Sequence, residues 1–581
     1  MTVSEYIFDF LQKKGVNTVY MVSGSSAMWL TDALCRNDQL KAVCCQHEQA
    51  AAMAADGSGR VNGIPGAALV TIGPGATNAI TGVAGAYVDS SPMFVISGQA
   101  NSKILQYQKD TGIRQKGTQS LILGSMVKDI TKHFAEVMDP AYIRYHMERA
   151  YDEAMSGRTG PVWIDVPIDI QNRQIPDEMK GYDAKHSEEC EVDWDMIEGA
   201  LCRAQRPLIL AGYGVLSAGV RDELLSFVKR LQIPVVTSRG GIGVIPSSNP
   251  LFIGRPGSYG DRASHFAVQE CDMLLILGSR LAQSTTGYYP DHLAPDAVKI
   301  MVDIDNKELE KGDVPIDLSI KADLAVFVKE LNTRSKEWKT KDHTEWIDHC
   351  RTNKVKYPVV LESYGSEDGI NSYLFTDKLS KFAPDNTTVV VDTGSVCNIV
   401  SQSWNLKDNQ KYVISGGLSC MGFWASSIGV ANNGNTVIAL SGDGSTQMNI
   451  QEFATLKYYN LPIKLFVYNN KGYMLIRHNQ HNYMDDRFLG VGPDCGVPSV
   501  DFCAVGAAYN LPTVHIGDKS EIEEKIKEVF AIDGPVICEV MVQKFGTIAP
   551  RIASRVMPDG SLKAAEFDDL WPFLDEEKSN G

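Results

Sequence analysis

The residues best suited to chemistry lie in the stretch 439–473, ALSGDGSTQMNIQEFATLKYYNLPIKLFVYNNKGY. Asp443 stands between Gly442 and Gly444, and Asn470 follows 27 residues after Asp443. Glycines let a backbone turn tightly and approach a ligand closely. A carboxylate, an amide oxygen and a nearby main-chain carbonyl are hard oxygen ligands of the kind that Mg²⁺ takes, together with phosphate and water. The pattern therefore predicts a magnesium–phosphate site.

Two strands and an intervening helix must position these residues. A buried strand runs into Gly442, apolar residues between 450 and 456 predict a helix, and the run KLFVY (464–468) predicts a second strand. The N-terminus of such a helix attracts phosphate. Because neighbouring parallel strands end at the same edge of a sheet, we expect Asp443 and Asn470 side by side. A GDG sequence alone is often only a turn; its combination with the helix and the asparagine pair favours a metal site.

With this motif the chain resembles the thiamine-diphosphate enzyme family, whose signature is GDG followed by a helix, a strand and NN. The resemblance implies that Asp443, Asn470 and the main-chain carbonyl of Gly472 hold Mg²⁺ on the diphosphate of the cofactor. It covers nearly the whole chain, about residues 1–545.

A second family element is the segment VCCQHEQAAAMAADGSGR (43–60), in which Glu48 begins a helix of small residues. Taken alone, a glutamate near a helix start usually serves as a cap or a surface charge. The segment matches the family's HEQAA pattern. The resemblance implies that Glu48 bonds the aminopyrimidine ring and favours its imino tautomer, which calls for a carboxyl in an apolar site with a raised pKa.

Three further segments are similar to the acetolactate synthase branch: GPGATN (73–78), SGGLSCMGF (415–423) and DTGS (392–395). The resemblance implies that Met421 is wedged beneath the bent cofactor, that DTGS cradles the terminal phosphate and that Gln119 orients bound intermediates. The residues expected to bind the cofactor are Gly24, Asn78, Thr393, Gly394, Ser395, Gly417, Met421, Gly442, Gly444, Ser445, Tyr473 and Met474.

The middle of the chain contains segments that are compatible with a bound nucleotide. The segments VTSRGGIG (236–243), GSRLAQSTTG (278–287) and MVDIDNKEL (301–309) resemble the FAD-binding central domain of acetolactate synthases. The alternative is a related domain that has lost its nucleotide. If FAD binds, the residues expected to contact it are Gly212, Gly241, Gly257, Arg280 and Asp303.

Short β-branched runs alternate with helical segments along the whole chain, which predicts an α/β fold of three doubly wound parallel-sheet domains. We expect a pyrimidine-binding domain at 1–180, a central FAD-binding-like domain at 190–335, a diphosphate- and magnesium-binding domain at 365–550 and a tail at 551–581. The 581 residues are too many for one hydrophobic core.

The composition of the chain limits the kinds of partner that we expect. The net charge is −16 and no basic run occurs, which argues against duplex nucleic acid as a partner. The N-terminus lacks the pattern of a signal peptide, and no apolar stretch reaches the length of a membrane span. The twelve cysteines are scattered without a CxxC pair, so we expect a reduced, cytoplasmic protein without membrane contact.

The acceptor side departs from true acetolactate synthases. Thr118 stands where those enzymes have phenylalanine, Ser284 replaces their second arginine, and Asn479 replaces a tryptophan that grips the acceptor. The loss of an arginine and two aromatic residues predicts a larger, more polar acceptor than a second 2-oxo acid. The pattern is closer to acetolactate-synthase-like enzymes of cell-surface polysaccharide pathways, some of which transfer a two-carbon unit to a keto-sugar nucleotide.

We therefore expect a carboligase that decarboxylates pyruvate and transfers the two-carbon unit to a carbonyl acceptor, such as a keto-sugar nucleotide. The alternatives are acetolactate synthase, a simple 2-oxo acid decarboxylase, and a non-catalytic protein on the same fold. The last would be indicated by a missing glutamate or a broken metal motif, and both are intact. The resemblance also implies a homodimer or homotetramer in which Glu48 and Asp443 of one active site come from different subunits.

Overall fold

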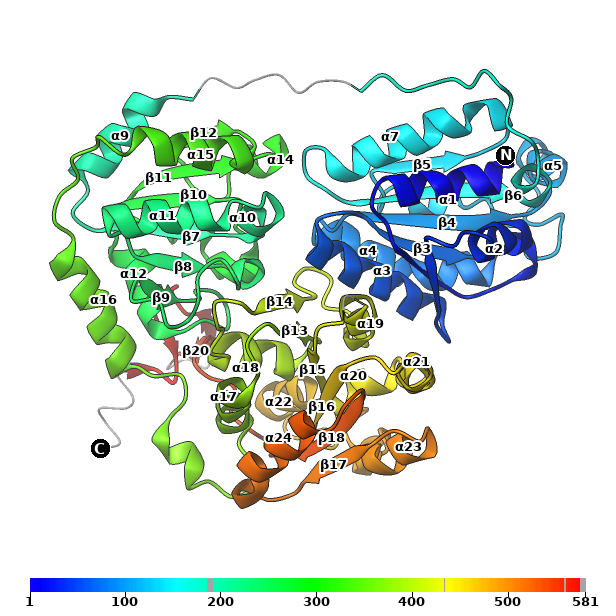
Figure 1. The fold of residues 1–581 in the computed structure, drawn as a ribbon. Coiled ribbons are helices and arrows are strands. Elements are labelled where there is room, and N and C mark those ends of the chain that lie inside the picture. The colour runs from blue at the N-terminus through cyan, green and yellow to red at the C-terminus, as the bar shows by residue number, and fades with distance from the viewer. Residues whose placement is uncertain (185–191, 433, 558–560, 575–581) are drawn as a thin grey trace.

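A computed structural model of the chain describes residues 1–184, 192–432, 434–557 and 561–574, and shows three lobes (Figure 1). Each lobe contains a six-stranded parallel sheet flanked by helices. The predicted α/β class with three doubly wound parallel sheets is thereby confirmed. Part of the polar stretch between the first two lobes, 185–191, lies outside the described residues.

The N-terminal sheet has the order β2-β1-β3-β4-β6-β5. Its strands are β1 (Thr18–Met21), β2 (Lys41–Cys44), β3 (Gly66–Val70), β4 (Met93–Gln99), β5 (His133–Glu136) and β6 (Pro161–Pro167). Its main helices are α1 (Val3–Lys13), α2 (Met28–Cys35), α3 (Glu48–Asn62), α4 (Pro74–Val88), α5 (Ser102–Thr111) and α7 (Ile143–Met155).

The C-terminal sheet repeats this order as β14-β13-β15-β16-β18-β17. Its strands are β13 (Thr388–Val391), β14 (Lys411–Ile414), β15 (Val437–Gly442), β16 (Ile463–Asn469), β17 (Thr513–Ile516) and β18 (Val536–Met541). The helices of this lobe are α17 (Ser372–Phe382), α18 (Ser395–Ser403), α19 (Ser426–Ala431), α20 (Asp443–Gln447), α21 (Phe453–Tyr459), α22 (Met474–Tyr483), α23 (Phe502–Ala508) and α24 (Ile522–Ala531).

The central sheet has a different order, β12-β11-β10-β7-β8-β9. Counted from β7 it is the 3-2-1-4-5-6 order of dinucleotide-binding sheets, which bind ligands where the order reverses, here between β7 and β10. The strands are β7 (Pro207–Ala211), β8 (Val235–Thr237), β9 (Phe252–Gly254), β10 (Met273–Leu277), β11 (Val298–Asp303) and β12 (Leu318–Lys321). The main helices are α9 (Trp194–Arg203), α11 (Arg221–Leu231), α12 (Arg262–Glu270) and α15 (Leu324–Arg334), with α16 (Thr344–Lys356) leading to the C-terminal lobe.

The two outer lobes share a continuous hydrophobic core. Helix α3 of the first packs closely on α19 of the third because both carry small residues. A Cβ added to Gly429 would lie 1.7 Å from the carbonyl oxygen of Ala54, and one added to Gly57 would lie 2.3 Å from that of Ser426. This close approach holds the start of α3 next to the loops of the C-terminal sheet.

The tail folds back onto the central lobe through short antiparallel pairs, β19 (Arg551–Ile552) with β22 (Leu570–Trp571) and β20 (Ser554–Val556) with β21 (Leu562–Ala564). Phe567 and Phe573 are buried in the central lobe's core, and the Phe567 ring stacks on His265 at 4.1 Å. The aromatic residues of the tail therefore pack onto another domain.

The single helix expected after Asp443 is broken into three pieces, α20, the 3₁₀ turn Ile450–Glu452 and α21. Asn449 leaves the helical conformation, with φ −133° and ψ 30°. Its amide donates to the carbonyl of Gly422 at 3.0 Å, a bond that a continuous helix would not place there.

Candidate active site

Asp443 and Asn470 lie at the same edge of the C-terminal sheet. Strands β15 and β16 pair in parallel with Gly442 opposite Tyr468, so the residues after each strand emerge together. Asp443 begins α20, and its Oδ2 accepts a hydrogen bond of 2.6 Å from the backbone N–H of Gly472. The structure thus brings together the three residues expected to hold the metal.

The chemistry of this edge fits a cation. Asp443 is 5% exposed, and its Oδ1 has no hydrogen-bond partner in the part of the chain that the structure describes. A buried polar oxygen without a partner is costly and is normally satisfied by a ligand. Burial raises the pKa of Asp443 to about 6, a shift that a bound divalent cation would oppose.

The loop after β16 is shaped for close approach. Gly472 has φ +136°, in the region that favours glycine, and a Cβ there would lie 2.1 Å from the carbonyl oxygen of Val491. The ring of Tyr473 lies against Gly444, where a Cβ would come within 2.1 Å of it. Met474, also expected at the cofactor, is buried in a small cluster with Tyr373 and Ile548.

A buried arginine fixes this loop from behind. Arg477 of α22 is 2% exposed and donates to the carbonyl oxygens of Asn470 at 3.3 Å and of Lys471 at 2.8 Å. It also bonds the carbonyls of Val491 at 2.8 Å and of Lys544 at 2.5 Å. Carbonyls from three backbone segments therefore meet at one guanidinium, although nothing in the sequence pattern singled out Arg477.

Asp392 connects two further loops that were expected at the cofactor. Its buried carboxylate accepts hydrogen bonds from the N–H groups of Thr393 (2.8 Å), Phe423 (3.1 Å) and Trp424 (3.3 Å), and from the hydroxyl of Ser441 (2.8 Å). Burial raises the pKa of this carboxyl, and the donors oppose that shift. Thr393, Gly394 with φ +81° and Ser395 follow directly and lead into α18.

The loop that carries Met421 is held from both sides. The hydroxyl of Ser445 accepts a 3.1 Å hydrogen bond from the N–H of Gly422, which ties the loop to α20. The N–H of Gly417 donates to Asp89 at 2.7 Å, which ties the loop to the N-terminal lobe. Met421 itself is half-buried.

Glu48 lies at the first residue of α3 and is half-buried. Its Oε2 accepts a 2.9 Å hydrogen bond from the amide of Asn78, a residue that was expected to contact the cofactor directly. Gly75 approaches the other carboxylate oxygen, with its Cβ position 3.5 Å away. The backbone of Gln119, with φ +63°, lies against Gly73.

Gly24 lies at the carboxyl end of β1, where the N-terminal strand order reverses, and has no room for a side chain because a Cβ would lie 2.4 Å from Thr71. The carboxyl ends of the N-terminal strands therefore carry Gly24, Glu48 and the 73–78 loop. In the C-terminal lobe the residues expected at the diphosphate and the metal likewise follow the carboxyl ends of strands, after β13, β15 and β16.

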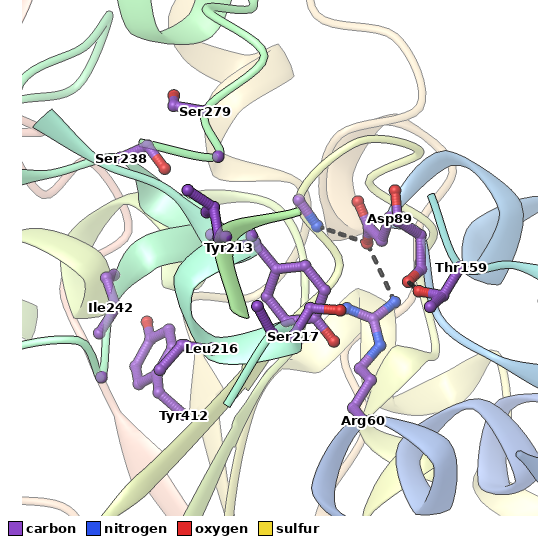
Figure 2. A pocket seen from close by; sticks show the side chains of 18 of the residues that line it. Arg60, Asp89, Thr159, Tyr213, Leu216, Ser217, Ser238, Ile242, Ser279 and Tyr412 are labelled. Atoms are coloured by element: carbon purple, nitrogen blue, oxygen red, sulfur yellow. Dashed lines mark hydrogen bonds and ion pairs between the residues drawn. The ribbon is translucent and has the colours of Figure 1, made fainter. Parts of the chain in front are cut away.

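A cavity of about 710 Å³ lies where the central lobe meets the two outer ones (Figure 2). Figure 2 shows Tyr213, Leu216 and Tyr412 on its wall, with Arg60 ion-paired to Asp89. The loops after β7, β10 and β11 line it, so it lies at the point where the strand order reverses.

Two of the five residues expected to contact a nucleotide, Arg280 and Asp303, line this cavity. Burial raises the pKa of Asp303. Gly212 and Gly241 instead provide close backbone packing, with Cβ positions 2.1 Å from Gly278 and 2.2 Å from Ala211. Gly257, with φ +144°, lines a smaller neighbouring pocket beside Tyr259.

Comparison with known families matches all three lobes. Residues 1–126 match the thiamine pyrophosphate enzyme N-terminal TPP binding domain, 197–331 the central domain and 392–540 the C-terminal TPP binding domain. The chain belongs to the thiamine pyrophosphate enzyme family. Its lobes are therefore two cofactor-binding domains and a central domain, and the recognised resemblance is confirmed.

The similar proteins place this thiamine pyrophosphate enzyme in the acetolactate synthase-like branch, as a transferase-type enzyme. A probable acetolactate synthase large subunit of Methanocaldococcus jannaschii is 30% identical over 99% of both chains. Acetolactate synthase isozyme 2 large subunit of Escherichia coli is 30% identical, over 95% of this chain and 97% of its own. The chloroplastic acetolactate synthase 2 of Zea mays is also 30% identical, over 95% of this chain and 87% of its own.

Sequence patterns did not reveal the supporting polar residues of this thiamine pyrophosphate enzyme. Asp392 belongs to the recognised DTGS segment, but its role as acceptor for a second loop depends on a contact across the sheet. Arg477 has no motif, and only its burial in the folded chain shows what it does. Among the described residues no helix is both long and apolar enough to cross a membrane.

Proposed function

We propose that this thiamine pyrophosphate enzyme decarboxylates pyruvate and transfers the two-carbon unit to a carbonyl acceptor, using thiamine diphosphate and Mg²⁺. The observation that carries the proposal is the buried, unpartnered Oδ1 of Asp443 beside Asn470 and Gly472, at the carboxyl end of the family's diphosphate-binding sheet. Pyruvate as donor is supported by the similarity to acetolactate synthases.

In this proposal the C-terminal lobe binds the diphosphate of the cofactor, and the N-terminal lobe supplies the glutamate that activates the cofactor. When bound, thiamine diphosphate supplies the carbon nucleophile and the electron sink for decarboxylation. Asp443, Asn470 and the carbonyl of Gly472 hold Mg²⁺, and the N–H groups at the starts of α18 and α20 receive the phosphates. Met421 would contact the cofactor, since its side chain is apolar and polarisable.

Glu48 holds and moves a proton at the pyrimidine ring nitrogen. The amide of Asn78 fixes one oxygen of its carboxylate at 2.9 Å, so the other oxygen would be left for the cofactor. Gln119, on the loop that packs on Gly73, orients the reacting groups. Closure of this half-buried edge would exclude water from the site.

The active site would be completed by a second copy of the chain. Leu418 and Met448 flank the loop of Met421 and remain 39% and 45% exposed. Large apolar side chains at a binding edge favour a covering protein surface. A homodimer or homotetramer, in which Glu48 of one subunit faces Asp443 of its partner, accounts for this exposure.

We also propose that the central cavity binds FAD in a structural role. Its position at the reversal of a 3-2-1-4-5-6 sheet and its lining by Arg280 and Asp303 support a dinucleotide. The visible absorbance of the purified protein tests this: a flavin spectrum is expected, and a colourless protein that fails to take up added FAD would contradict it.

The acceptor that we favour is a keto-sugar nucleotide. Thr118, Ser284 and Asn479, which stand where acetolactate synthases have larger or charged side chains, are all exposed. Open, polar positions suit a bulky polar acceptor better than a second pyruvate. Acetolactate synthesis, with pyruvate as both donor and acceptor, is the second candidate, because the similar proteins carry that name.

Product analysis by NMR tests the proposal. The purified protein is incubated with pyruvate, thiamine diphosphate, Mg²⁺ and FAD, first alone and then with keto-sugar nucleotides. Slow release of CO₂ without acceptor and rapid carboligation with it are expected. Rapid accumulation of acetolactate would establish the second candidate, and release of CO₂ with no acceptor used would indicate a simple decarboxylase.

A further inference from the structure

Glu452 reaches from the C-terminal lobe into the N-terminal one. It lies nine residues after Asp443, at the end of the 3₁₀ turn, and its side chain is completely buried. Its Oε1 accepts hydrogen bonds from the backbone N–H groups of Gln46 (2.9 Å) and His47 (3.0 Å). Its Oε2 accepts from the hydroxyl of Thr455 at 2.6 Å.

These partners leave the charge of Glu452 without a cation among the described residues. Burying a carboxylate in this way is expensive, because hydrogen bonds replace only part of its hydration. Burial raises the pKa of Glu452 to about 7, although the hydrogen bonds from Thr455, Gln46 and His47 each lower that pKa. An apolar residue would fill the same space more cheaply, so the acceptor atoms call for an explanation.

The two N–H groups that Glu452 holds belong to the residues directly before Glu48. Gln46 and His47 connect β2 to α3, and their path decides where the first residue of α3 points its carboxylate. The C-terminal lobe also holds the last residue of β2, because the hydroxyl of Tyr459 accepts a 2.8 Å hydrogen bond from the N–H of Cys44. The start of α3 is thus set largely by the neighbouring lobe.

The 3₁₀ turn that carries Glu452 is tied to the cofactor loops of its own chain. The N–H of Glu452 donates to the carbonyl of Asn449 at 2.9 Å, and the amide of Asn449 bonds Gly422 beside Met421. The same segment begins at Asp443. A displacement of α20, which begins at Asp443, would therefore also shift Glu452.

We propose that Glu452 is a positioning residue that sets Glu48 through the Gln46–His47 connection. This inference rests on the proposed function in one respect: Glu48 serves the cofactor of the partner subunit, whereas Asp443 and Glu452 belong to the segment that holds the chain's own cofactor. Glu452 consequently links the diphosphate site of one active centre to the proton-transfer group of the other.

The test compares three variants. Glu452→Asp withdraws the carboxylate by one methylene and breaks its contact with the two N–H groups. Glu452→Gln keeps an acceptor oxygen for them and is the conservative rescue. Thr455→Val removes only the hydroxyl contact and is the matched control at the same carboxylate.

Amide hydrogen exchange of the 44–48 segment, measured on the cofactor-free chain, reads the contact directly. Faster exchange is expected in Glu452→Asp and near-wild-type exchange in Glu452→Gln and Thr455→Val. With cofactor bound, Glu452→Asp should slow deuterium exchange at C2 of thiamine diphosphate and lower kcat at least tenfold, with cofactor affinity and KM within threefold. Unchanged C2 exchange, or a loss of cofactor affinity that accounts for the lower rate, would overturn the proposal.

If Glu452→Asp does not fold, Gln46→Pro removes one N–H donor from the other side of the contact, and the same slow C2 exchange is expected. Normal exchange in that variant would overturn the proposal. Because C2 exchange needs neither pyruvate nor acceptor, it is independent of whether the proposed carboligation is correct.

Mixed assemblies of two differently tagged chains test the link between centres. With Glu452→Asp and Asp443→Asn on separate chains, one centre keeps an intact Asp443 and a well-placed Glu48, so about half of the wild-type activity is expected. With both changes on one chain and a wild-type partner, each centre is impaired and activity should fall at least fivefold below that. The reverse ranking would mean that Glu452 acts on the Asp443 loop of its own chain, and would contradict the proposal.

Discussion

The two outer lobes have the same strand order but treat polar groups at their carboxyl edges differently. In the C-terminal lobe, Asp392 receives four hydrogen bonds and Arg477 donates to carbonyls of three loop segments, so these contacts fix the loops from within the lobe. In the N-terminal lobe Glu48 is half-buried, and the turn before it is held by a neighbour. In the proposed function, one lobe is thus preformed for cofactor binding, and the other depends on a neighbouring lobe to position its activating glutamate.

If binding and activation are separate in this way, Glu48→Gln gives the largest loss of turnover. The amide cannot relay the proton, and general acid–base catalysis is worth about 10²–10⁴-fold, so kcat should fall at least ~100-fold. The affinity for thiamine diphosphate, measured by calorimetry with Mg²⁺, should stay within threefold. Turnover within tenfold of wild type would rule out the assigned role.

Asp443→Asn should show the opposite behaviour, with binding as the main loss. An amide oxygen is a weaker ligand than a carboxylate, so cofactor affinity in the presence of Mg²⁺ should weaken about 100-fold, or about 2.8 kcal/mol. Saturating cofactor should recover part of the activity. Equal affinity in calorimetric titrations of the variant and the wild type would show that the orphaned oxygen of Asp443 has another purpose.

A smaller effect is expected where α20 supports the loop of Met421. Ser445→Ala leaves the buried N–H of Gly422 without its acceptor, which costs about 1–3 kcal/mol. We expect kcat to fall about tenfold with a modest change in melting temperature. Ser427→Ala is the control, because the hydroxyl of Ser427 is buried and has no hydrogen-bond partner in the described chain. Equal effects of the two changes would show that the hydrogen bond from Gly422 to Ser445 does not support the loop of Met421.

The smallest effect concerns stability in the N-terminal lobe. Asp165 is fully buried, accepts from Ser97 (2.5 Å) and Gln99 (2.9 Å), and burial raises its pKa to about 7 from 3.8. Its contribution to stability is complete below pH 4, falls as the pH rises to about 7 and is absent above. Asp165→Asn has no carboxyl to ionise, so it is spared the loss of stability that the wild type suffers as the pH rises. The melting temperature of the variant minus that of the wild type should therefore increase by a few degrees between pH 4.5 and pH 8. A constant difference between the two proteins across that range would contradict the raised pKa.

Sequence patterns predicted the features that are local or fixed by motif. The parallel sheets followed from alternating β-branched runs, and the placement of Asp443 and Asn470 at one edge of the sheet followed from strand order. The patterns did not predict the break at Asn449, because it depends on a hydrogen bond to a loop 27 residues earlier. Nor could they show that Glu452 contacts residues some 400 positions away, since only the packing of α3 on α19 creates that contact.

The expected nucleotide glycines show the same limit. A glycine can be required because a ligand approaches the backbone closely or because another backbone segment does. The sequence alone does not distinguish these two roles. Gly212 and Gly241 lie against backbone, whereas Arg280 and Asp303 line the cavity. Spatial neighbours, and not residue type, decide which role applies.

The proposed function places a binding lobe of one chain and an activating lobe of another in each active site. It is tested most directly by mixing a Glu48→Gln chain with an Asp443→Asn chain and measuring pyruvate decarboxylation by the separated mixed assembly. We predict that activity reappears, up to half that of the wild type, because one of the two sites then contains an intact Glu48 and an intact Asp443. A mixed assembly as inactive as its parents would contradict the account, since it would place both residues of each site on one chain.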